Sequence, residues 1–223
     1  MRASIFPQSE PNLNSDHSDE LPANSIDGNN NWLYASYLLV VGARIGSISV
    51  KGLDVFEKVA EKSIFEALQD ASVVLSIREA FIRVKPSKLQ AFQFDLAKCP
   101  HLCLPLILLA AKAKGTTVLD NVQLLEKQLG AQWSYQLETL SSLGINIKTQ
   151  DNLLLINGSA ENKRLPVENT ISEDPLMILC QIILALDSDQ KVTIENIERI
   201  EEVFPDFISD LNTILTNKIE LFI

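Results

Sequence analysis

The hydrophobic and polar positions of the chain follow one pattern three times. Each time an apolar helix is followed by a short polar break, a strand rich in β-branched residues, and then Gly or Asn before an aliphatic residue. These segments cover residues 34–53, 103–122 and 176–197. The pattern therefore recurs about every 70 residues, which is the length of a supersecondary unit rather than of a single element.

Each repeat continues with a second helix that has polar residues on one face. In the first two repeats a pair of short strands follows this helix. The third repeat is expected to end with one strand at residues 218–223, cut short by the C-terminus. The expected second helices cover residues 55–70, 124–143 and about 205–216, and the expected strand pairs cover residues 72–76 with 80–84 and 145–148 with 152–156. The pattern predicts three helix-strand-helix-strand-strand units.

One helix in each unit is apolar almost all round, as residues 104–111 and 177–186 illustrate. Such a helix has no face for water and has to be surrounded by protein on every side. The second helix of each unit carries a polar face and is expected nearer to solvent. An α/β fold with helices inside and sheets outside follows from this difference.

Domain boundaries are indicated by a change in composition near residue 30. Residues 1–30 contain three prolines, five acidic residues and many Asn and Ser, which is typical of a flexible acidic arm. An edge strand or a tether within this arm is the alternative. Residues 31–223 are expected to form a single domain, with units at about 31–92, 93–160 and 161–223.

Composition restricts the classes of partner. With 223 residues, 46% of them hydrophobic and 22% charged, the chain has the make-up of a soluble globular protein. The net charge of −10 repels nucleic acid and anionic lipid, and the few lysines and arginines are too scattered to form a basic stripe. Neither a membrane span nor a secretion signal is recognisable. We therefore expect a cytoplasmic protein without nucleic-acid or membrane partners.

The cysteines do not indicate a disulfide framework. Cys99, Cys103 and Cys180 are odd in number, and the first two are four residues apart in an apolar helical context. Buried free thiols in a reducing compartment are the expected state. A metal site would need further ligands, and the histidines of the chain are His17 and His101. No metal ion and no cofactor are therefore expected.

Several segments, taken in order, resemble the C-terminal half of 5-enolpyruvylshikimate-3-phosphate synthase. A run at residues 31–37 (NWLYASY) is also similar to that family's Asp-x-Ser-Ser-Ala-Ser-Tyr segment. The segments in the C-terminal half are FDLAKCP at 94–100, GTTVLDNV at 115–122, residues 140–144, Asp174 with Met177, and FPDF at 204–207. In all, the resemblance covers about residues 26–215.

The resemblance implies an enolpyruvate-transferase-type domain, an inside-out α/β barrel. Enzymes of this family consist of two such domains and bind phosphoenolpyruvate and shikimate 3-phosphate in the cleft between them. They transfer the enolpyruvyl group to shikimate 3-phosphate in the shikimate pathway, which leads to the aromatic amino acids. This chain has room for one of the two domains. The family's anionic substrates require Lys and Arg for charge-assisted hydrogen bonds, with carboxylates and a histidine for proton movement.

Most positions that the resemblance marks as chemical are altered. Four cationic or proton-handling positions have become Gln128, Gln132, Leu176 and Glu202, and the family's active-site histidine has become Pro175. In full, the Lys-Glu-x-x-Arg box falls on Gln128, Leu129 and Gln132, and the Asp-His-Arg box falls on Asp174, Pro175 and Leu176. The upstream Asp and Ser pair falls on Asn31, Leu33 and Tyr34, and the Gln-Gly-Asp segment falls roughly on Phe56, Glu57 and Lys58. Asp95, which resembles the family's active-site aspartate, and Asp174 are the two acids that remain.

These changes favour a catalytically inactive relative, although whether any activity survives is left open. One alternative is half of a split enzyme that transfers enolpyruvyl from phosphoenolpyruvate to shikimate 3-phosphate. Another is a protein-interaction or self-association domain that uses the former cleft face. That face has become more apolar through Leu33, Leu129, Pro175 and Leu176. A gene fragment without function is the remaining alternative.

A few side chains have both a chemical and a structural interpretation. Asp95 is the candidate catalytic residue, but an aspartate between a strand and an apolar helix is also a common helix cap. His101 is either an imidazole in the former cleft or an exposed residue at a helix start. Trp32, Tyr34 and Tyr37 either form a stacking face for a ligand or pack in the core and at its rim.

Overall fold

The predicted repeat is present as three sheet-and-helix units arranged around a common set of helices. The structure is a computed structural model that describes residues 2–5, 25–159, 172–187, 192–215 and 219–222. The first unit contains β2 (Ser25–Asp27), α1 (Trp32–Arg44), β3 (Ile48–Lys51), η1 (Ala60–Ser63), α2 (Ile64–Asp70), β4 (Val74–Ile77) and β5 (Phe81–Lys85).

The second and third units follow the same order. The second contains β6 (Gln93–Asp95), η2 (Pro100–Leu102), α3 (Cys103–Lys112), β7 (Gly115–Asp120), α4 (Gln123–Leu129), α5 (Ala131–Ser142), β8 (Asn146–Gln150) and β9 (Leu153–Gly158). The third contains α6 (Pro175–Ala185), β10 (Val192–Glu195), η3 (Ile197–Glu202), α7 (Phe207–Leu215) and β11 (Ile219–Phe222), together with β1 (Arg2–Ile5).

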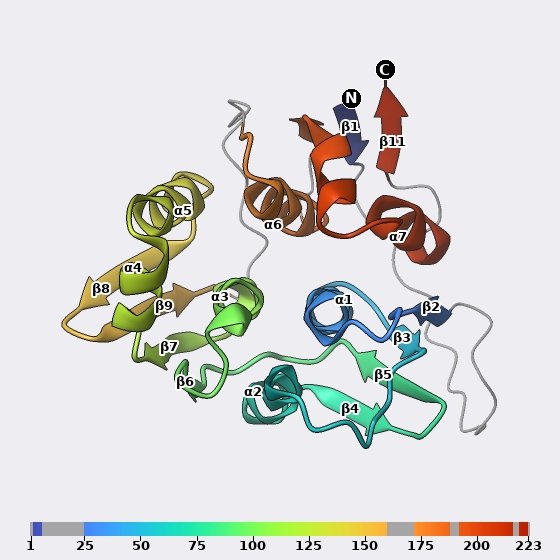
Figure 1. The fold of residues 1–223 in the computed structure, drawn as a ribbon, viewed down its shortest axis with the longest axis horizontal. Helices are drawn as coiled ribbons and strands as arrows, with labels where there is room; N and C mark the ends of the chain where they lie inside the picture. Colours follow the sequence, from blue (N-terminus) through green and yellow to red (C-terminus); the bar gives the residue numbers. More distant parts are fainter. Residues whose placement is uncertain (1, 6–24, 160–171, 188–191, 216–218, 223) are drawn as a thin grey trace.

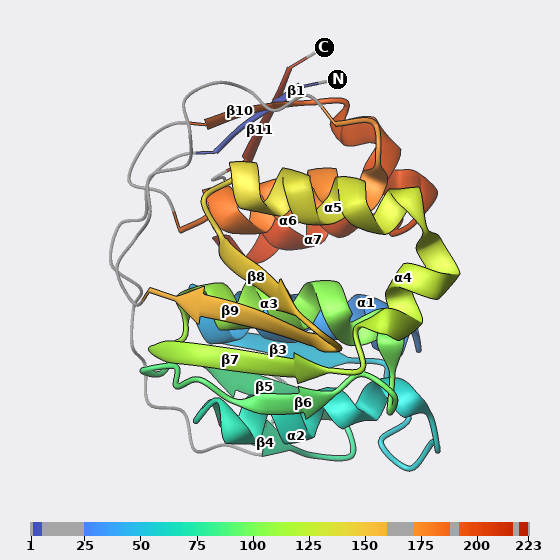
Figure 2. The ribbon, with the colours of Figure 1, turned by 90° about the vertical axis from the view of Figure 1, so that its left-hand side faces the viewer.

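The strand orders show how β1 belongs to the third unit. The first two sheets have the orders β2-β3-β5-β4 and β6-β7-β9-β8, each with one parallel pair at the first position and antiparallel pairs after it. The third sheet has the order β10-β1-β11, and both of its pairs are antiparallel. β1 therefore occupies the place that β5 and β9 occupy in their units. The N-terminal and C-terminal strands lie side by side (Figure 2).

This pairing corrects two expectations. Residues 1–30 were expected to form a flexible arm, with an edge strand or a tether as the alternative. Ser25–Asp27 is an edge strand, as the alternative had it, whereas Arg2–Ile5 is the central strand of another sheet. The third unit was expected to be cut short, but its missing strand comes from the N-terminal end of the chain. The physical reason is that a four-residue strand is stabilised by its neighbours in space, which local composition does not reveal. Residues 6–24 of the expected arm lie outside the described residues.

Three helices occupy the middle of the molecule, with the sheets around them (Figure 1). These are α1, α3 and α6, one from each unit, and α3 packs against both of the others. Between Met177 and Ala185 every residue of α6 is buried, and α3 is buried from Cys103 to Ala110. The prediction of helices inside and sheets outside is confirmed.

The second helices are shorter than the polar and apolar pattern suggested. In the first unit, residues 55–59 form a loop, which the Lys62 ammonium closes by donating to the backbone carbonyls of Val55 and Glu57. In the second unit, Gly130 divides the expected helix into α4 and α5. Its φ of 52° lies in the left-handed region, which glycine adopts at little cost.

The outer helix α7 is attached to the central helix α1 by a polar contact within an aromatic cluster. The Tyr34 hydroxyl donates a hydrogen bond to the Asp210 carboxylate, and the Tyr34 ring lies 5.3 Å from that of Phe204 and 6.0 Å from that of Phe207, between centroids. Burial raises the pKa of the Asp210 carboxyl, and the nearby negative charges of Asp206 and Asp27 raise it further, against the opposing effect of the Tyr34 hydrogen bond. The folded state therefore favours a proton on Asp210.

We expect the Asp210→Asn variant to be more stable than the wild type at pH 7 and equally stable near pH 4. Because the folded-state pKa is raised, the contribution of Asp210 is most favourable below its unfolded pKa and is lost as the pH rises through the folded value. The gain should stay below about 1 kcal/mol, because solvent screens a half-buried group. Urea unfolding at the two pH values measures it, and a variant that is less stable at pH 7 would contradict this assignment.

At their C-terminal ends, α1, α3 and α6 are joined by an ion cluster of Arg44, Lys112 and Asp187. Arg44 and Lys112 are in the last turns of α1 and α3, and Asp187 follows α6 by two residues. The Arg44 guanidinium is paired with Asp187 and also donates to the backbone carbonyl of Leu108, while the Lys112 ammonium lies 2.5 Å from Asp187. The Arg44 and Asp187 side chains are only 4% and 8% exposed. One carboxylate thus serves two cations at helix ends that favour positive charge.

Candidate functional site

A cavity lies at the opposite ends of the central helices, where α1, α3 and α6 begin, and α4 and α5 form its side. Its volume is about 140 Å³. It is lined by Leu33, Tyr37, Pro100, His101, Cys103, Leu104, Leu125, Gln128, Leu129, Gln132, Trp133, Gln136 and Leu176. The site is therefore built from helices of all three units, and no single sequence segment contains it.

The cavity brings together most of the altered positions that the sequence analysis singled out. Gln128 and Leu129 come from the end of α4, Gln132 from the start of α5, and Leu33 and Leu176 from the first turns of α1 and α6. None of the residues that line it is a lysine or an arginine. The cavity therefore offers apolar surface and amide groups, but no positive side chain that could bind a phosphate or a carboxylate.

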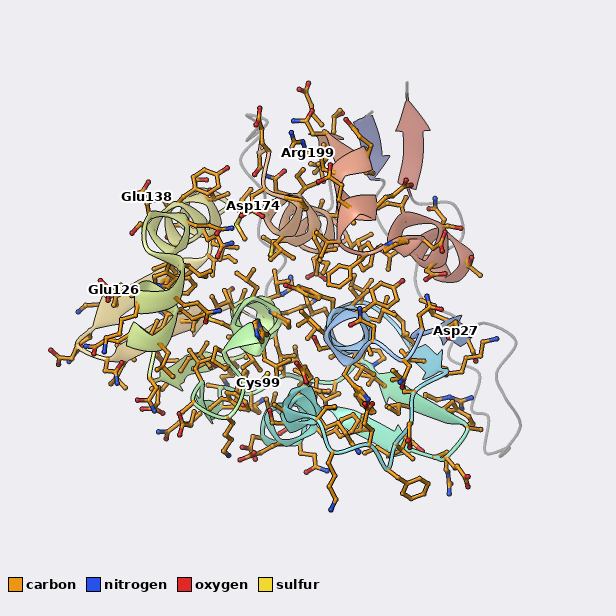
Figure 3. The ribbon with its side chains drawn as sticks, in the orientation of Figure 1. Asp27, Cys99, Glu126, Glu138, Asp174 and Arg199 are labelled. Atoms are coloured by element: carbon orange, nitrogen blue, oxygen red, sulfur yellow. The ribbon has the colours of Figure 1, made fainter. Side chains whose placement is uncertain are left out.

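Asp174, one of the two acids that remain, is occupied by structural hydrogen bonds. It precedes α6, and its side chain accepts a hydrogen bond from the backbone N–H of Leu176 at 2.9 Å. Its other oxygen accepts from the Gln136 amide at 3.0 Å and from the Gln132 amide at 3.4 Å. Figure 3 shows Asp174 lying between α5 and α6. The carboxylate caps one helix and ties it to its neighbour.

Gln136 is a cavity residue that the sequence analysis did not single out. It is 2% exposed, and it follows Gln132 by one helical turn on α5. That spacing was visible in the sequence and places both side chains on one face of the helix. Both amides donate to Asp174 through their nitrogen atoms, so the carbonyl oxygen of each amide points away from Asp174.

Asp95, the candidate catalytic residue, does not line the cavity. It ends β6, and its carboxylate accepts hydrogen bonds from the Asn121 side chain at 2.7 Å and from the backbone N–H of Ala97 at 2.8 Å. The hydrogen bond from Asn121 has the largest effect and lowers the pKa of the Asp95 carboxyl. The hydrogen bond from Ala97 and the positive charge of Lys98 lower it further. In the structure, Asp95 closes a turn, whereas the expected alternative was a helix cap. A catalytic role for it stays a prediction.

His101 lies in η2, just before α3, and its exposed imidazole lines the cavity. The structure thus places the histidine, and not Asp95, where the three central helices begin. The description of His101 as an exposed residue at a helix start is confirmed, and a role in the former cleft stays a prediction.

The aromatic residues of α1 are packing residues. Trp32 is 4% exposed, donates a hydrogen bond from its indole N–H to Glu57 at 3.0 Å and packs edge-on against Phe65. It does not line the cavity. Tyr37 is 1% exposed, and its ring packs in a tilted orientation against the ring of Phe204. The Tyr37 side chain also lines the cavity.

Two further positions implied by the resemblance lie outside the cavity lining. Glu202 is exposed at the end of η3, and Asn31 caps α1 by accepting a hydrogen bond from the backbone N–H of Tyr34 at 3.0 Å. The segment at residues 56–58 also lies elsewhere, in the loop after β3, where the Phe56 side chain is 75% exposed.

All three cysteines are buried and free, as expected. Burial raises the pKa of each thiol, and the nearby Cys180 raises the pKa of Cys103 further. Neutral thiols are poor nucleophiles. Within the described ranges, no group of three or more His, Cys, Asp or Glu side chains is arranged to hold a metal ion. No helix in the same part of the chain is long and apolar enough to cross a bilayer.

Comparison with known proteins gives one consistent result. A model of the family EPSP synthase (3-phosphoshikimate 1-carboxyvinyltransferase) matches residues 29–211. The 3-phosphoshikimate 1-carboxyvinyltransferase of Brachyspira hyodysenteriae is 27% identical over 186 residues, which is 82% of this chain and 44% of that protein. The enzyme of Clostridium acetobutylicum is 28% identical over 79% of this chain and 40% of its own length. The chain thus spans less than half the length of these relatives.

Solved structures agree with the fold. EPSP synthase from Acinetobacter baumannii superposes with a TM-score of 0.68 at 18% identity, covering 87% of this chain and 46% of that one. The enolpyruvyl transferase NikO from Streptomyces tendae superposes with a TM-score of 0.63 at 16% identity, covering 85% of this chain and 43% of that one. At these identities the likeness shows the fold alone.

Proposed function

The chain belongs to the EPSP synthase family, and from that membership we propose that it is a catalytically silent relative. It keeps the family's domain and lacks the side chains that would bind phosphoenolpyruvate and shikimate 3-phosphate. The observation that carries this proposal is the cavity lining, where Gln128, Gln132 and Leu176 stand at positions that the resemblance assigns to cations. A partner chain cannot supply side chains that this domain itself should contribute.

The size of the expected loss supports the proposal. Losing one charged partner of a bound phosphate or carboxylate costs about 1.5 to 3 kcal/mol. Four cationic or proton-handling positions are changed, so a total of about 6 kcal/mol is a low value even if the effects are not additive. Micromolar binding corresponds to about 8 kcal/mol, so about 2 kcal/mol would remain. The dissociation constant for such weak binding lies far above the millimolar range.

We expect titration calorimetry to detect no binding of shikimate 3-phosphate, alone or with phosphoenolpyruvate. The titration is made at low ionic strength, where attraction between charges is strongest. Circular dichroism and a cooperative melting curve show that the chain is folded. Submillimolar binding would contradict the proposal, because other cations would then have to serve the substrates.

A variant that restores cations provides the matched control. Gln128→Lys, Gln132→Arg and Leu176→Arg together place three cations in the cavity lining without changing a fully buried residue. We expect this variant to bind shikimate 3-phosphate more tightly than the wild type by at least tenfold. An unchanged affinity in a folded variant would mean that these positions do not face the substrates.

A split enzyme is the second candidate, and the observation in its favour is the length of the chain, which covers 44% of the Brachyspira hyodysenteriae relative. Enolpyruvyl transfer from phosphoenolpyruvate releases inorganic phosphate, so mixing the chain with the remaining part of that relative gives a direct assay. Phosphate release above that of either part would support the split enzyme. Its absence is the result we expect.

A protein-contact role is a further part of the proposal. The half-buried side chains of Leu33, Leu129 and Leu176 make the face around the cavity more apolar than a charged substrate site. A protein partner or a second copy would cover this face, and we place that contact in the cytoplasm. Light scattering that shows a monomer, together with a pull-down that recovers no partner, would remove the basis for this role.

A further inference from the structure

We propose that the cavity binds a compact, uncharged molecule with one apolar ring and one hydroxyl or amide hydrogen-bond donor. The inference rests on the proposed function, because it requires that the cavity does not bind the family's anionic substrates. It names an uncharged ligand class, whereas the family's substrates are anions.

The size of the cavity fits a single ring. Its volume is about 140 Å³, and an apolar cavity of about 150 Å³ in a protein takes up benzene. The walls come from five helices whose side chains are well packed, and Leu104, Leu125 and Trp133 are each less than 10% exposed. A ring that fills this space gains contact with the apolar side chains of these walls.

The polar groups of the cavity favour a donor over an anion. Asp174 accepts hydrogen bonds from the amide nitrogens of Gln132 and Gln136, so the carbonyl oxygens of these two residues can accept a hydrogen bond from a ligand. The Gln128 amide, the Tyr37 hydroxyl and the His101 imidazole also line the cavity and can accept one as well. A carboxylate or phosphate would meet those oxygens, the negative charge of Asp174 and no cation among the lining residues. An ion buried without a partner is costly, whereas a hydroxyl hydrogen bonded to a carbonyl oxygen is not.

The helix starts around the cavity do not reverse this preference. The N-termini of α1, α3, α5 and α6 lie around the cavity and attract anions in principle. However, the Asp174 carboxylate already caps α6, the Asn31 side chain caps α1, and Pro100 at the start of η2 has no N–H to offer. The positive ends of α1 and α6 are therefore satisfied by side chains of the chain itself, whereas α3 and α5 have no side-chain cap.

Two probes of similar size and different charge test the inference. Benzyl alcohol and benzoate each consist of a ring, one carbon and oxygen, but only benzoate is an anion. Trp133 lines the cavity, and the other tryptophan of the chain, Trp32, does not, so a Trp32→Phe variant reports from the cavity wall alone. Saturation-transfer NMR on the unmodified chain gives a second reading that does not depend on this variant.

We expect benzyl alcohol to change the Trp133 emission saturably at about 1 mM, as suits a ligand of eight heavy atoms. Benzoate should need at least a tenfold higher concentration. Equal affinity for both probes, or no saturable response to benzyl alcohol by either reading, would overturn the inference.

A charge placed in the wall should reverse the selectivity. Leu176→Arg puts a cation at the cavity rim, so benzoate should bind at least tenfold more tightly than to the parent chain. The matched control is Val203→Arg, which adds the same charge at an exposed position outside the lining and should leave both affinities unchanged. If both variants behave alike, the probes do not occupy the cavity.

The outcome is independent of the calorimetry with the family's substrates. If neither probe binds and shikimate 3-phosphate is also silent, the inference fails while the proposed function stands. If shikimate 3-phosphate binds, the proposed function itself fails.

Discussion

Replacing Asp187 by alanine is expected to lower the free energy of unfolding by about 3 to 5 kcal/mol, because breaking a buried ion pair leaves an uncompensated charge. Asp187 is the shared partner of Arg44 and Lys112 at the ends of the three central helices. The Nε atom of Arg44 is already buried without a hydrogen-bond partner. Once the carboxylate is gone, the guanidinium keeps its hydrogen bond to the Leu108 carbonyl. Urea unfolding followed by circular dichroism measures the loss.

An exposed ion pair on the same molecule is the control. Glu66 and Lys98 are joined at 2.6 Å, but their side chains are 51% and 45% exposed. Glu66→Ala should therefore cost only about 0 to 1 kcal/mol. Asp187→Asn, which keeps an acceptor of the same shape, should fall between the two. Equal small losses for Asp187→Ala and Glu66→Ala would show that the ion cluster does not hold the units together.

A proline at position 3 is expected to destabilise the protein by about 2 kcal/mol or more. Ala3 is in β1 and stands opposite Ile194 on one side and Leu221 on the other. Because β1 has a strand on each side, its backbone N–H groups point at neighbouring strands, and proline removes one of them. The carbonyl that loses its donor adds the cost of an unsatisfied acceptor. The change should appear as a lower melting temperature.

Ala3→Ser is the matched control, because it keeps the N–H group and changes the side chain by one atom. It should lower the stability by less than half the loss caused by Ala3→Pro. If residues 2–5 were a free arm, as their composition suggests, the two variants would melt at the same temperature. The comparison therefore decides directly whether β1 completes the third unit.

The local pattern predicted the elements that bury a complete face. Central helices α3 and α6 are apolar all round, and the paired strands β8 and β9 alternate on either side of a turn, so their types followed from periodicity. The third sheet could not be found in this way. β1 pairs with β10 and β11, whose residues stand between 187 (192 − 5) and 220 (222 − 2) positions further along the chain. Four residues carry too little pattern to indicate such partners.

For the site, the sequence supplied the residue types and the structure supplied their neighbourhood. The resemblance pointed to Gln128, Gln132 and Leu176, and all three line the cavity. It also pointed to Asp95, which closes a turn elsewhere, while His101 from the same segment does line the cavity. Gln136 was missed, although it stands one helical turn after Gln132.

The sequence by itself determined the repeat, the buried helices, the family and the residue types at the positions that the resemblance marks, because each of these depends on residue type and on spacing along the chain. Only the tertiary structure decided that the two ends of the chain share a sheet, that Asp187 joins three helix ends, and that Gln132 and Gln136 both donate hydrogen bonds to Asp174. These features depend on which segments meet in space, and that is set by the packing of three units at once, not by any one of them.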